Sequence, residues 1–192
     1  MNMAMKWTVG LAVVTALGGQ GWADTYAIDP AHSSVEFRVT HLMVSKVRGN
    51  FEKFAGGFEY DPKAIAVWKA SATVDAASIN TRVEKRDAHL RSGDFFDVGK
   101  FPTLEFRSAG VETEKDGRKH LKGDLTLHGV TKSVVLDLEE GGVTKDPWGG
   151  TRAGFTASGK INRRDFGLAA GTPGAMVGDT VEITIEVEGV KK

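Results

Sequence analysis

Hydrophobic and polar residues alternate along most of this chain, and the clearest example is the stretch 34–41. Successive side chains of a β-strand point to opposite faces, so strict alternation predicts a strand with one buried and one wet face. The other face of the stretch carries Glu36, Arg38 and Thr40. The residues that we expect on the buried face are Val35, Phe37, Val39 and His41.

The same alternation recurs down the chain and predicts further strands. Asp116-Gly117 and His128-Gly129 are typical of tight hairpin turns, and the glycines at 141 and 142 predict a loop that runs on to Gly150. Phe51 and Phe54 do not fit a period of two, so we expect a bulge between them. The predicted strands are residues 56–60, 66–75, 103–109, 111–114, 120–127, 131–139, 152–161 and 180–187.

Residues 81–102 interrupt the alternation and predict a short helix followed by an aromatic segment. Thr81 and Glu84 have the spacing of a capping box, and Asp87 and Arg91 are placed for an i,i+4 ion pair. Gly93 suits a left-handed helix end. Apolar residues follow at once, so this segment must lie against core or ligand. They are Phe95, Phe96, Val98 and Phe101.

Strands with one apolar face bury it in a two-sheet sandwich or in a closed barrel. The predicted buried rows contain many small residues, which would leave an ordinary sandwich core poorly filled but leave room inside a barrel. The small residues are Ala70, Ala72, Ala153, Ala157 and Gly159. We therefore expect an all-β fold, an antiparallel barrel of roughly eight strands capped by one or two short helices.

The N-terminus has the pattern of a secretory signal peptide over residues 1–23, with Lys6, a short apolar run and small residues before Asp24. Residues 24–192 then form one domain, and its apolar runs are shorter than a transmembrane helix needs. This part has 24 basic and 25 acidic residues, a charge near −1, which argues against nucleic acid as a partner. The chain has 0 Cys, so it has neither disulfides nor thiolate chemistry.

An enzyme hypothesis starts from Asp87, His89 and Arg91, whose groups can do acid–base chemistry. Side chains two residues apart on a helix point in different directions, so His89 should not share a site with both Asp87 and Arg91. We therefore favour a structural role for these residues and expect no catalytic residues. The histidine spacings match no metal motif, and we expect neither metal nor cofactor. Arg163 and Arg164 could hold an anionic head group, although such pairs are more often solvated.

Three motifs together resemble the YceI family. They are Asp87-Ala88-His89-Leu90-Arg91-Ser92 with Phe95-Phe96-Asp97 and Lys100-Phe101-Pro102, then Gly123-Asp124-Leu125-Thr126-Leu127-His128-Gly129-Val130-Thr131, then Asn162-Arg163-Arg164-Asp165-Phe166-Gly167. The resemblance extends from Tyr26 to the final strand. It implies a lipocalin-like, usually periplasmic barrel whose apolar pore accommodates a polyisoprenoid or a similar long amphiphile. A homodimer and transient membrane contact are compatible with it.

The expected function is therefore a periplasmic carrier or store of a polyisoprenoid, quinone or similar lipid. Two alternatives stay open, an enzyme acting near Asp87, His89 and Arg91, and a filled barrel that serves as a protein-interaction module. The expected ligand-binding residues come from the apolar rows and the aromatic segment. They are Val35, Phe37, Val39, His41, Phe51, Phe54, Leu90, Phe95, Phe96, Leu104, Phe106, Leu125, Leu127, Ala153, Phe155, Ala157, Phe166 and Ile183.

Overall fold

The computed structural model describes residues 23–65 and 68–192. The expected signal peptide lies outside the described residues except for Ala23, and so does the beginning of the strand expected at 66–75. Among the described helices, none is long and apolar enough to cross a membrane.

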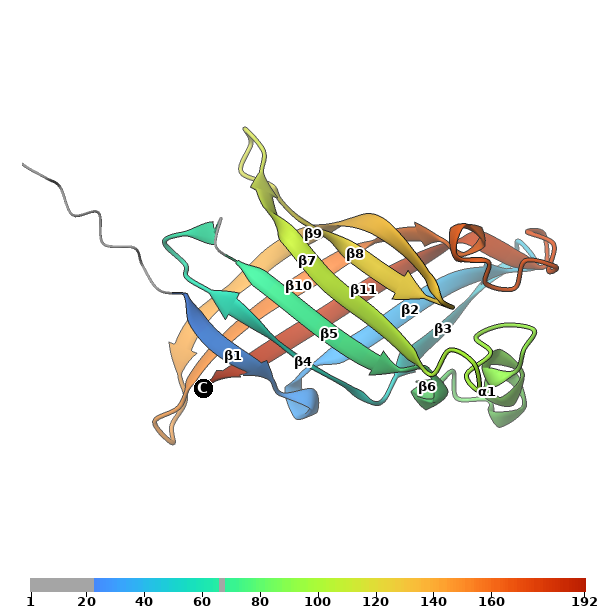
Figure 1. Ribbon diagram of the computed structural model, residues 1–192, viewed down its shortest axis with the longest axis horizontal. Coiled ribbons are helices and arrows are strands. Elements are labelled where there is room, and N and C mark those ends of the chain that lie inside the picture. Colours follow the sequence, from blue (N-terminus) through green and yellow to red (C-terminus); the bar gives the residue numbers. More distant parts are fainter. Residues whose placement is uncertain (1–22, 66–67) are drawn as a thin grey trace, which may run out of the picture.

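Eleven strands form one antiparallel sheet (Figure 1). The first six strands are the halves of three long strands. Each long strand is interrupted once, by the 3-10 helix η1 (Pro30–His32), by Glu52 and Lys53, or by the 3-10 helix η3 (Ala76–Ser78). The broken strands are β1 (Asp24–Ile28) with β2 (Ser34–His41), β3 (Ser45–Phe51) with β4 (Phe54–Tyr60), and β5 (Lys69–Asp75) with β6 (Ile79–Asn80). The unbroken strands are β7 (Thr103–Thr113), β8 (Lys119–Leu127), β9 (Val130–Lys145), β10 (Thr151–Asn162) and β11 (Val177–Lys191).

The sheet closes on itself because the last strand pairs with the first. β11 pairs with β2 from Val177 to Glu186 and then with β1 from Gly189 to Lys191. When each broken strand is counted as one, neighbours in the sheet are otherwise neighbours in sequence: β1 and β2 pair with β4 and β3, which pair with β5 and β6. The result is a closed antiparallel barrel of eight long strands, which confirms the predicted fold class.

Two predicted interruptions are wrong, because the sheet absorbs them as irregularities. The two strands expected at 103–109 and 111–114 are the single strand β7, with a register shift between Ser108 and Gly110. The loop expected from Gly141 is strand as far as Lys145, with a register shift opposite Gly154 and Phe155. Gly110 and Gly142 have φ of 153° and 89°, which only glycine adopts easily. These two glycines therefore allow the register shifts.

The predicted short helix is α1 (Glu84–Arg91), but its expected end signals are wrong. Val83 occupies the N-cap position, and its apolar side chain cannot accept a hydrogen bond. The Thr81 amide and hydroxyl both donate to the buried Asp87 carboxylate instead of forming a capping box with Glu84. The helix ends at Ser92, whose backbone is extended.

The barrel end where β1 begins and β11 ends (Figure 1) is filled by a cluster of buried hydrophobic side chains. The Tyr26 and Phe58 rings stack with centroids 5.0 Å apart, and Trp68 meets Phe155 edge-on at 4.7 Å. The Phe58 ring covers Gly189 so closely that a Cβ there would lie 2.4 Å from it. Aromatic packing therefore seals this end, and the remaining interior opens toward the end that carries α1 and the 3-10 helix η4 (Arg163–Phe166).

Candidate functional site

A cavity of about 200 Å³ lies inside the barrel. Almost all of the side chains around it are aliphatic or aromatic, and they come from the wall strands and from the segment after β6. An engineered apolar cavity of about 150 Å³ stays dry and takes up benzene, so a lumen of this size and lining favours an apolar guest over water. The filled-barrel alternative does not predict such a cavity.

Most of the candidate residues line this lumen. The positions of those in strands follow from alternation, which turns every second side chain inward, whereas Leu90, Phe95 and Phe96 reach the lumen from α1 and the segment after it. Whether they contact a ligand stays a prediction. The lining candidates are Val35, Phe37, Val39, Phe51, Phe54, Leu90, Phe95, Phe96, Leu104, Phe106, Leu125, Leu127, Phe155, Ala157 and Ile183.

Three candidates lie elsewhere. His41 is exposed at the end of β2, where the strand extends past the rim and its inward row meets solvent. Ala153 is buried in the aromatic core near the termini, below the floor of the lumen. Phe166 is buried against Leu127 and Leu168, one layer behind the lining. For His41 and Ala153, alternation gave the right side of the strand but not the depth along the barrel, whereas Phe166 lies in η4, where strand alternation does not apply.

Several lining residues were missed although their pattern was visible. Val181, Ile185 and Val187 share the inward row of β11 with Ile183, and Val134 and Leu136 alternate in β9. Leu168 and Val177, in contrast, reach the lumen from the loop after η4 and from the start of β11. The loop has no strand alternation, so its inward residue could be found only from the tertiary structure.

Arg163 organises the loop that follows η4. Its side chain is only 2% exposed, and burial lowers its pKa while the Asp179 carboxylate, 2.8 Å away, opposes the shift. All three guanidinium nitrogens donate, and five of the acceptors are backbone carbonyls. The carbonyls belong to Leu168, Ala169, Thr172, Val177 and Gly178.

The neighbouring Arg164 donates to the Asp179 carboxylate at 2.6 Å and to the carbonyls of Ala170 and Thr172. Asn162 caps η4 by accepting from the Arg164 amide, and Gly167 ends it with φ of 66°. Both arginines are therefore occupied in holding the loop together. The expectation that this pair is simply solvated is wrong for Arg163, and neither guanidinium is left free for an anionic head group.

Residues 81–102, which we call the closing segment, fill a gap in the barrel wall. The β5–β7 ladder ends at the pair Asp75 and Thr103, and beyond it β6 turns away to pair with β3. The closing segment lies at this end of the barrel (Figure 1). Three of its side chains reach the lumen, namely Leu90, Phe95 and Phe96.

The polar side chains of α1 point to separate partners. Asp87 is 3% exposed and accepts from Thr81, whereas His89 lies 3.1 Å from the exposed Asp94. Arg91 donates to the carbonyls of Ala77 and Ile79. The expected Asp87–Arg91 ion pair is thus wrong, because Asp87 binds Thr81 while Arg91 binds backbone carbonyls outside the helix and the carboxylate of Glu84. The enzyme hypothesis requires these three side chains to converge on one site, and their contacts direct them to separate partners.

Comparison with known proteins agrees with this geometry. The family model for the YceI-like domain matches residues 26–189. The chain belongs to the YceI family. A UPF0312 protein of Vibrio vulnificus is 42% identical over 185 residues, covering 95% of this chain and 96% of that protein.

Solved structures show the same fold. The YceI protein of Campylobacter jejuni is 37% identical, with a TM-score of 0.73 over 80% of this chain and 90% of that one. A polyisoprenoid-binding domain from Saccharophagus degradans shares only 17% identity, with a TM-score of 0.64 over 87% of this chain and 98% of the domain. At that identity the likeness shows the fold alone.

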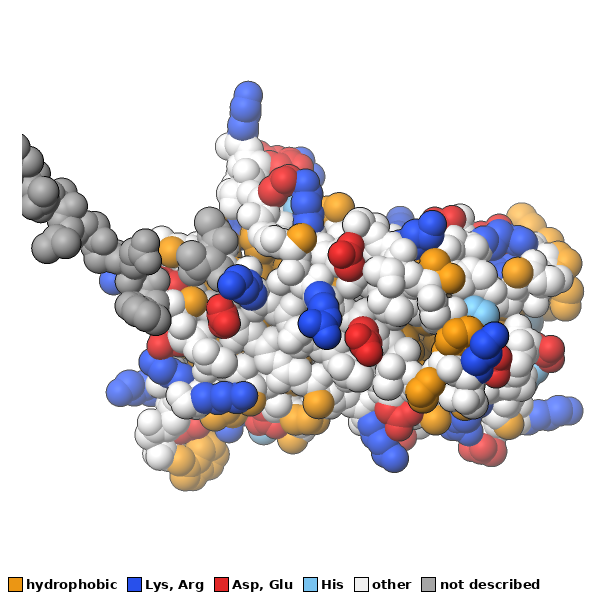
Figure 2. All heavy atoms as spheres, in the orientation of Figure 1, with side chains coloured by type: hydrophobic (Ala, Val, Ile, Leu, Met, Phe, Trp, Pro, Cys, Tyr) orange, Lys and Arg blue, Asp and Glu red, His pale blue; other side chains and the backbone are white. Residues whose placement is uncertain are grey.

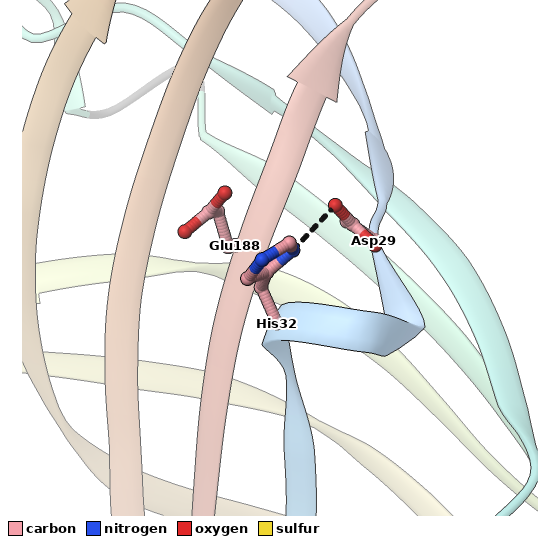
Figure 3. Close-up of side chains that lie close together, drawn as sticks. All are labelled: Asp29, His32 and Glu188. Carbon is pink, nitrogen blue, oxygen red and sulfur yellow. Dashed lines mark hydrogen bonds and ion pairs between the residues drawn. The ribbon is translucent and has the colours of Figure 1, made fainter. Parts of the chain in front are cut away.

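This YceI-family barrel also carries a polar cluster where η1 meets β11. Asp29, His32 and Glu188 each place a ligand-type atom within 4.8 Å of the others (Figure 3). The sequence spacing could not reveal this, since Glu188 comes from the last strand. The His32 Nδ1 lies 2.9 Å from the Asp29 carboxylate, and the Asp29 side chain also accepts from the Ala31 amide.

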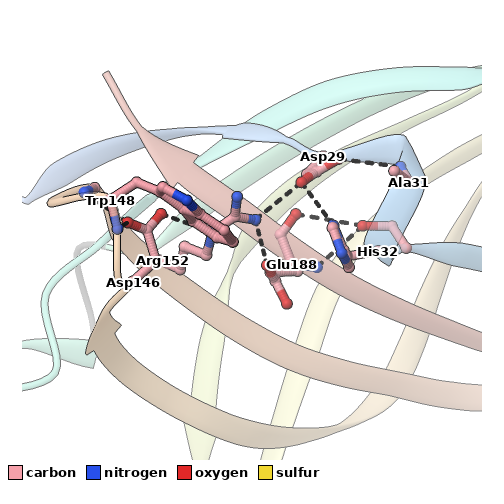
Figure 4. Close-up of polar contacts among 9 residues, drawn as sticks. Asp29, Ala31, His32, Asp146, Trp148, Arg152 and Glu188 are labelled. Atoms are coloured by element: carbon pink, nitrogen blue, oxygen red, sulfur yellow. Dashed lines mark hydrogen bonds and ion pairs between the residues drawn. The ribbon is translucent and has the colours of Figure 1, made fainter.

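Arg152 bridges the carboxylates of this cluster (Figure 4). Its guanidinium donates to Asp29 at 2.9 Å and to Asp146 at 3.1 Å, and it also pairs with Glu188. Hydrogen bonds from His32, then from Arg152 and the Ala31 amide, lower the pKa of Asp29 to about 2. A metal cation would compete with this guanidinium for both carboxylates. The cluster is best described as an ion-pair network that pins β1, β10 and β11 where the barrel closes.

Proposed function

We propose that the protein holds a long-chain isoprenoid lipid, or an amphiphile with a similar tail, in the barrel lumen and carries or stores it in the periplasm. The observation that carries the proposal is the apolar cavity of about 200 Å³. The Saccharophagus degradans domain supports it, since a protein of the same fold is described as polyisoprenoid-binding. The signal-peptide pattern of residues 1–23 supports the location.

The size of the lumen bears on how a long lipid would be held. A cavity only somewhat larger than one that takes benzene accommodates part of an isoprenoid chain. A longer chain needs extra space, and the closing segment is the part best placed to provide it. Its residues lie outside the strand ladders of the wall, so they can move without breaking the sheet.

Binding energetics favour exchange over permanent storage. Each CH₂ that leaves water gains about 0.8 kcal/mol, but a membrane offers the lipid nearly the same gain. Transfer between bilayer and lumen is then close to neutral, and the shape of the cavity decides which lipids are held. A carrier requires this balance, because a lipid bound too tightly would not be released.

Native mass spectrometry of the mature protein tests the proposal. The purified protein is mixed with farnesol, geranylgeraniol or solanesol, prenyl alcohols of increasing length, and with octadecanol as an unbranched control. We expect mass shifts of one lipid per protein, with the prenyl alcohols preferred over octadecanol. Equal uptake of octadecanol would point to general alkyl-chain binding, and no shift with any lipid would refute the proposal.

The location is tested separately. Expression of the full chain, followed by periplasmic extraction and intact-mass measurement, should give a protein that begins near Asp24. A full-length protein retained in the cytosolic fraction would refute the periplasmic location without affecting lipid binding.

A further inference from the structure

The turn between β2 and β3 exposes three consecutive large hydrophobic side chains. Leu42, Met43 and Val44 are 52%, 77% and 84% exposed. Met176 is 51% exposed and lies beside them, since the Leu42 amide donates to its carbonyl at 3.0 Å. These four residues form what we call the apolar tip. It lies at the barrel end that carries η4, where Figure 2 shows hydrophobic side chains on the surface.

The backbone of this turn is unusual for the residues in it. Leu42 and Met43 have φ of 50° and 59°, the left-handed region. Tight hairpin turns normally place Asn, Asp or Gly at such positions, because larger side chains are sterically disfavoured there. Leu42 and Met43 are therefore unfavourable here for two reasons: their backbone conformation disfavours large side chains, and their apolar side chains are exposed to water. A local conflict of this kind marks a functional constraint.

The apolar tip is continuous with the lumen. Val39 and Val177 both line the cavity, and Val177 pairs with His41 immediately before the turn. Met176 directly precedes Val177 in the chain. An apolar surface thus runs from the exposed turn along β2 and β11 into the barrel.

The charged side chains beside the turn already contact one another, with four basic groups sharing two carboxylates. Glu182 binds Lys46 at 2.7 Å and Arg38 at 2.8 Å, and Asp179 binds both Arg163 and Arg164. Each of these basic groups is held by a carboxylate, whereas the apolar side chains of the turn are exposed, so an apolar contact suits this end better. A projecting turn with few side chains also covers much less area than the roughly 800 Å² per partner of a stable protein interface. Shallow insertion among lipid head groups needs only such a small apolar projection.

We propose that the apolar tip docks the barrel on a lipid bilayer, so that lipid passes between bilayer and lumen along a continuous apolar surface. This inference rests on the proposed lipid-binding function and adds the surface through which the lipid would be exchanged. Because exposed apolar side chains carry the contact, docking should occur on neutral phosphatidylcholine and depend little on salt.

Flotation with phosphatidylcholine vesicles tests the docking surface. The variant combines Leu42→Asn and Met43→Gly, which removes two apolar side chains and supplies the residues that the turn prefers. We expect vesicle partitioning to fall by about tenfold or more, while the melting temperature stays equal or rises. Trp148→Ser is the matched control, since Trp148 is 85% exposed on the β9–β10 turn at the other end of the barrel. It should leave partitioning unchanged.

The outcomes separate docking from lipid binding. The double variant should still take up geranylgeraniol from detergent solution, as measured by native mass spectrometry, because its lumen is intact. Wild-type protein that floats with vesicles but takes up no prenyl alcohol would refute the proposed function and leave docking standing. Wild-type protein that does not float, or a double variant that floats equally well, would overturn the docking inference.

Discussion

Phe96 meets Phe51 edge-on, with ring centroids 5.7 Å apart and an interplanar angle of 83°. Phe51 belongs to the wall strand β3, whereas Phe96 belongs to the closing segment. Both side chains line the lumen. This contact therefore joins a part of the barrel end that lies outside the strand ladders to a part that the sheet holds in place.

Truncating this contact should loosen the closing segment. Phe96 is half-buried, so we expect Phe96→Ala to cost about 1–3 kcal/mol of stability and to speed the exchange of geranylgeraniol. Hydrogen exchange should show faster exchange of amides in residues 81–102 than in the central strands. Trp68→Ala, in the aromatic core at the packed end and outside the lumen lining, should cost about 3–5 kcal/mol without speeding lipid exchange. Protection of residues 81–102 equal to that of the central strands would contradict this role.

Filling the lumen should block lipid uptake. Ala157 is 2% exposed and lines the cavity, so the side chain added by Ala157→Trp would occupy space that we assign to the lipid. Overpacking should cost about 1–3 kcal/mol, which leaves the barrel folded. Thr156→Trp is the control, because the adjacent residue of the strand faces outward. Native mass spectrometry should show lipid on the Thr156 variant only, and lipid on both would argue against the lumen as the binding site.

Removing the Arg163 side chain should release the loop after η4. Arg163→Met leaves buried backbone carbonyls without their donors, and we expect a loss of about 3–5 kcal/mol in urea unfolding. Arg164 shares the same Asp179 partner, but its side chain is 40% exposed. Arg164→Met should therefore cost no more than about 1 kcal/mol. Similar losses for the two variants would show that the buried network is not what orders the loop.

The Asp29 network should make stability depend on pH in the acid range. The pKa of Asp29 is lowered to about 2, so its interactions are fully present above its unfolded value near 3.8 and are lost as the pH falls through about 2. Wild-type protein should therefore be more stable than Asp29→Asn at pH 7, and the difference should shrink between pH 4 and pH 2. Urea midpoints at pH 7, 4 and 2 measure this. A difference that is constant with pH would contradict the assignment.

Strand alternation determined the wall of the barrel. Rows such as Val35, Phe37 and Val39 point inward wherever they lie in a strand, so the fold class and most lining residues follow from local periodicity. Periodicity carries no information about depth, which is why Ala153 was placed in the lumen although it lies under the aromatic core. The pattern at glycines 141 and 142 was likewise ambiguous, since a turn and a β-bulge can both require the positive φ that glycine adopts easily.

Only the tertiary structure decided the polar contacts and the two ends of the barrel. Arg163 is buried because six acceptors from the loop after η4 and from the start of β11 surround its guanidinium, and no periodic pattern in the sequence indicates this. Asp29 meets Glu188 because barrel closure brings the last strand beside the first. The sequence by itself determined an all-β barrel with an apolar interior, because side-chain alternation is local. Which end is sealed, and where the apolar tip lies, depend on contacts between distant segments.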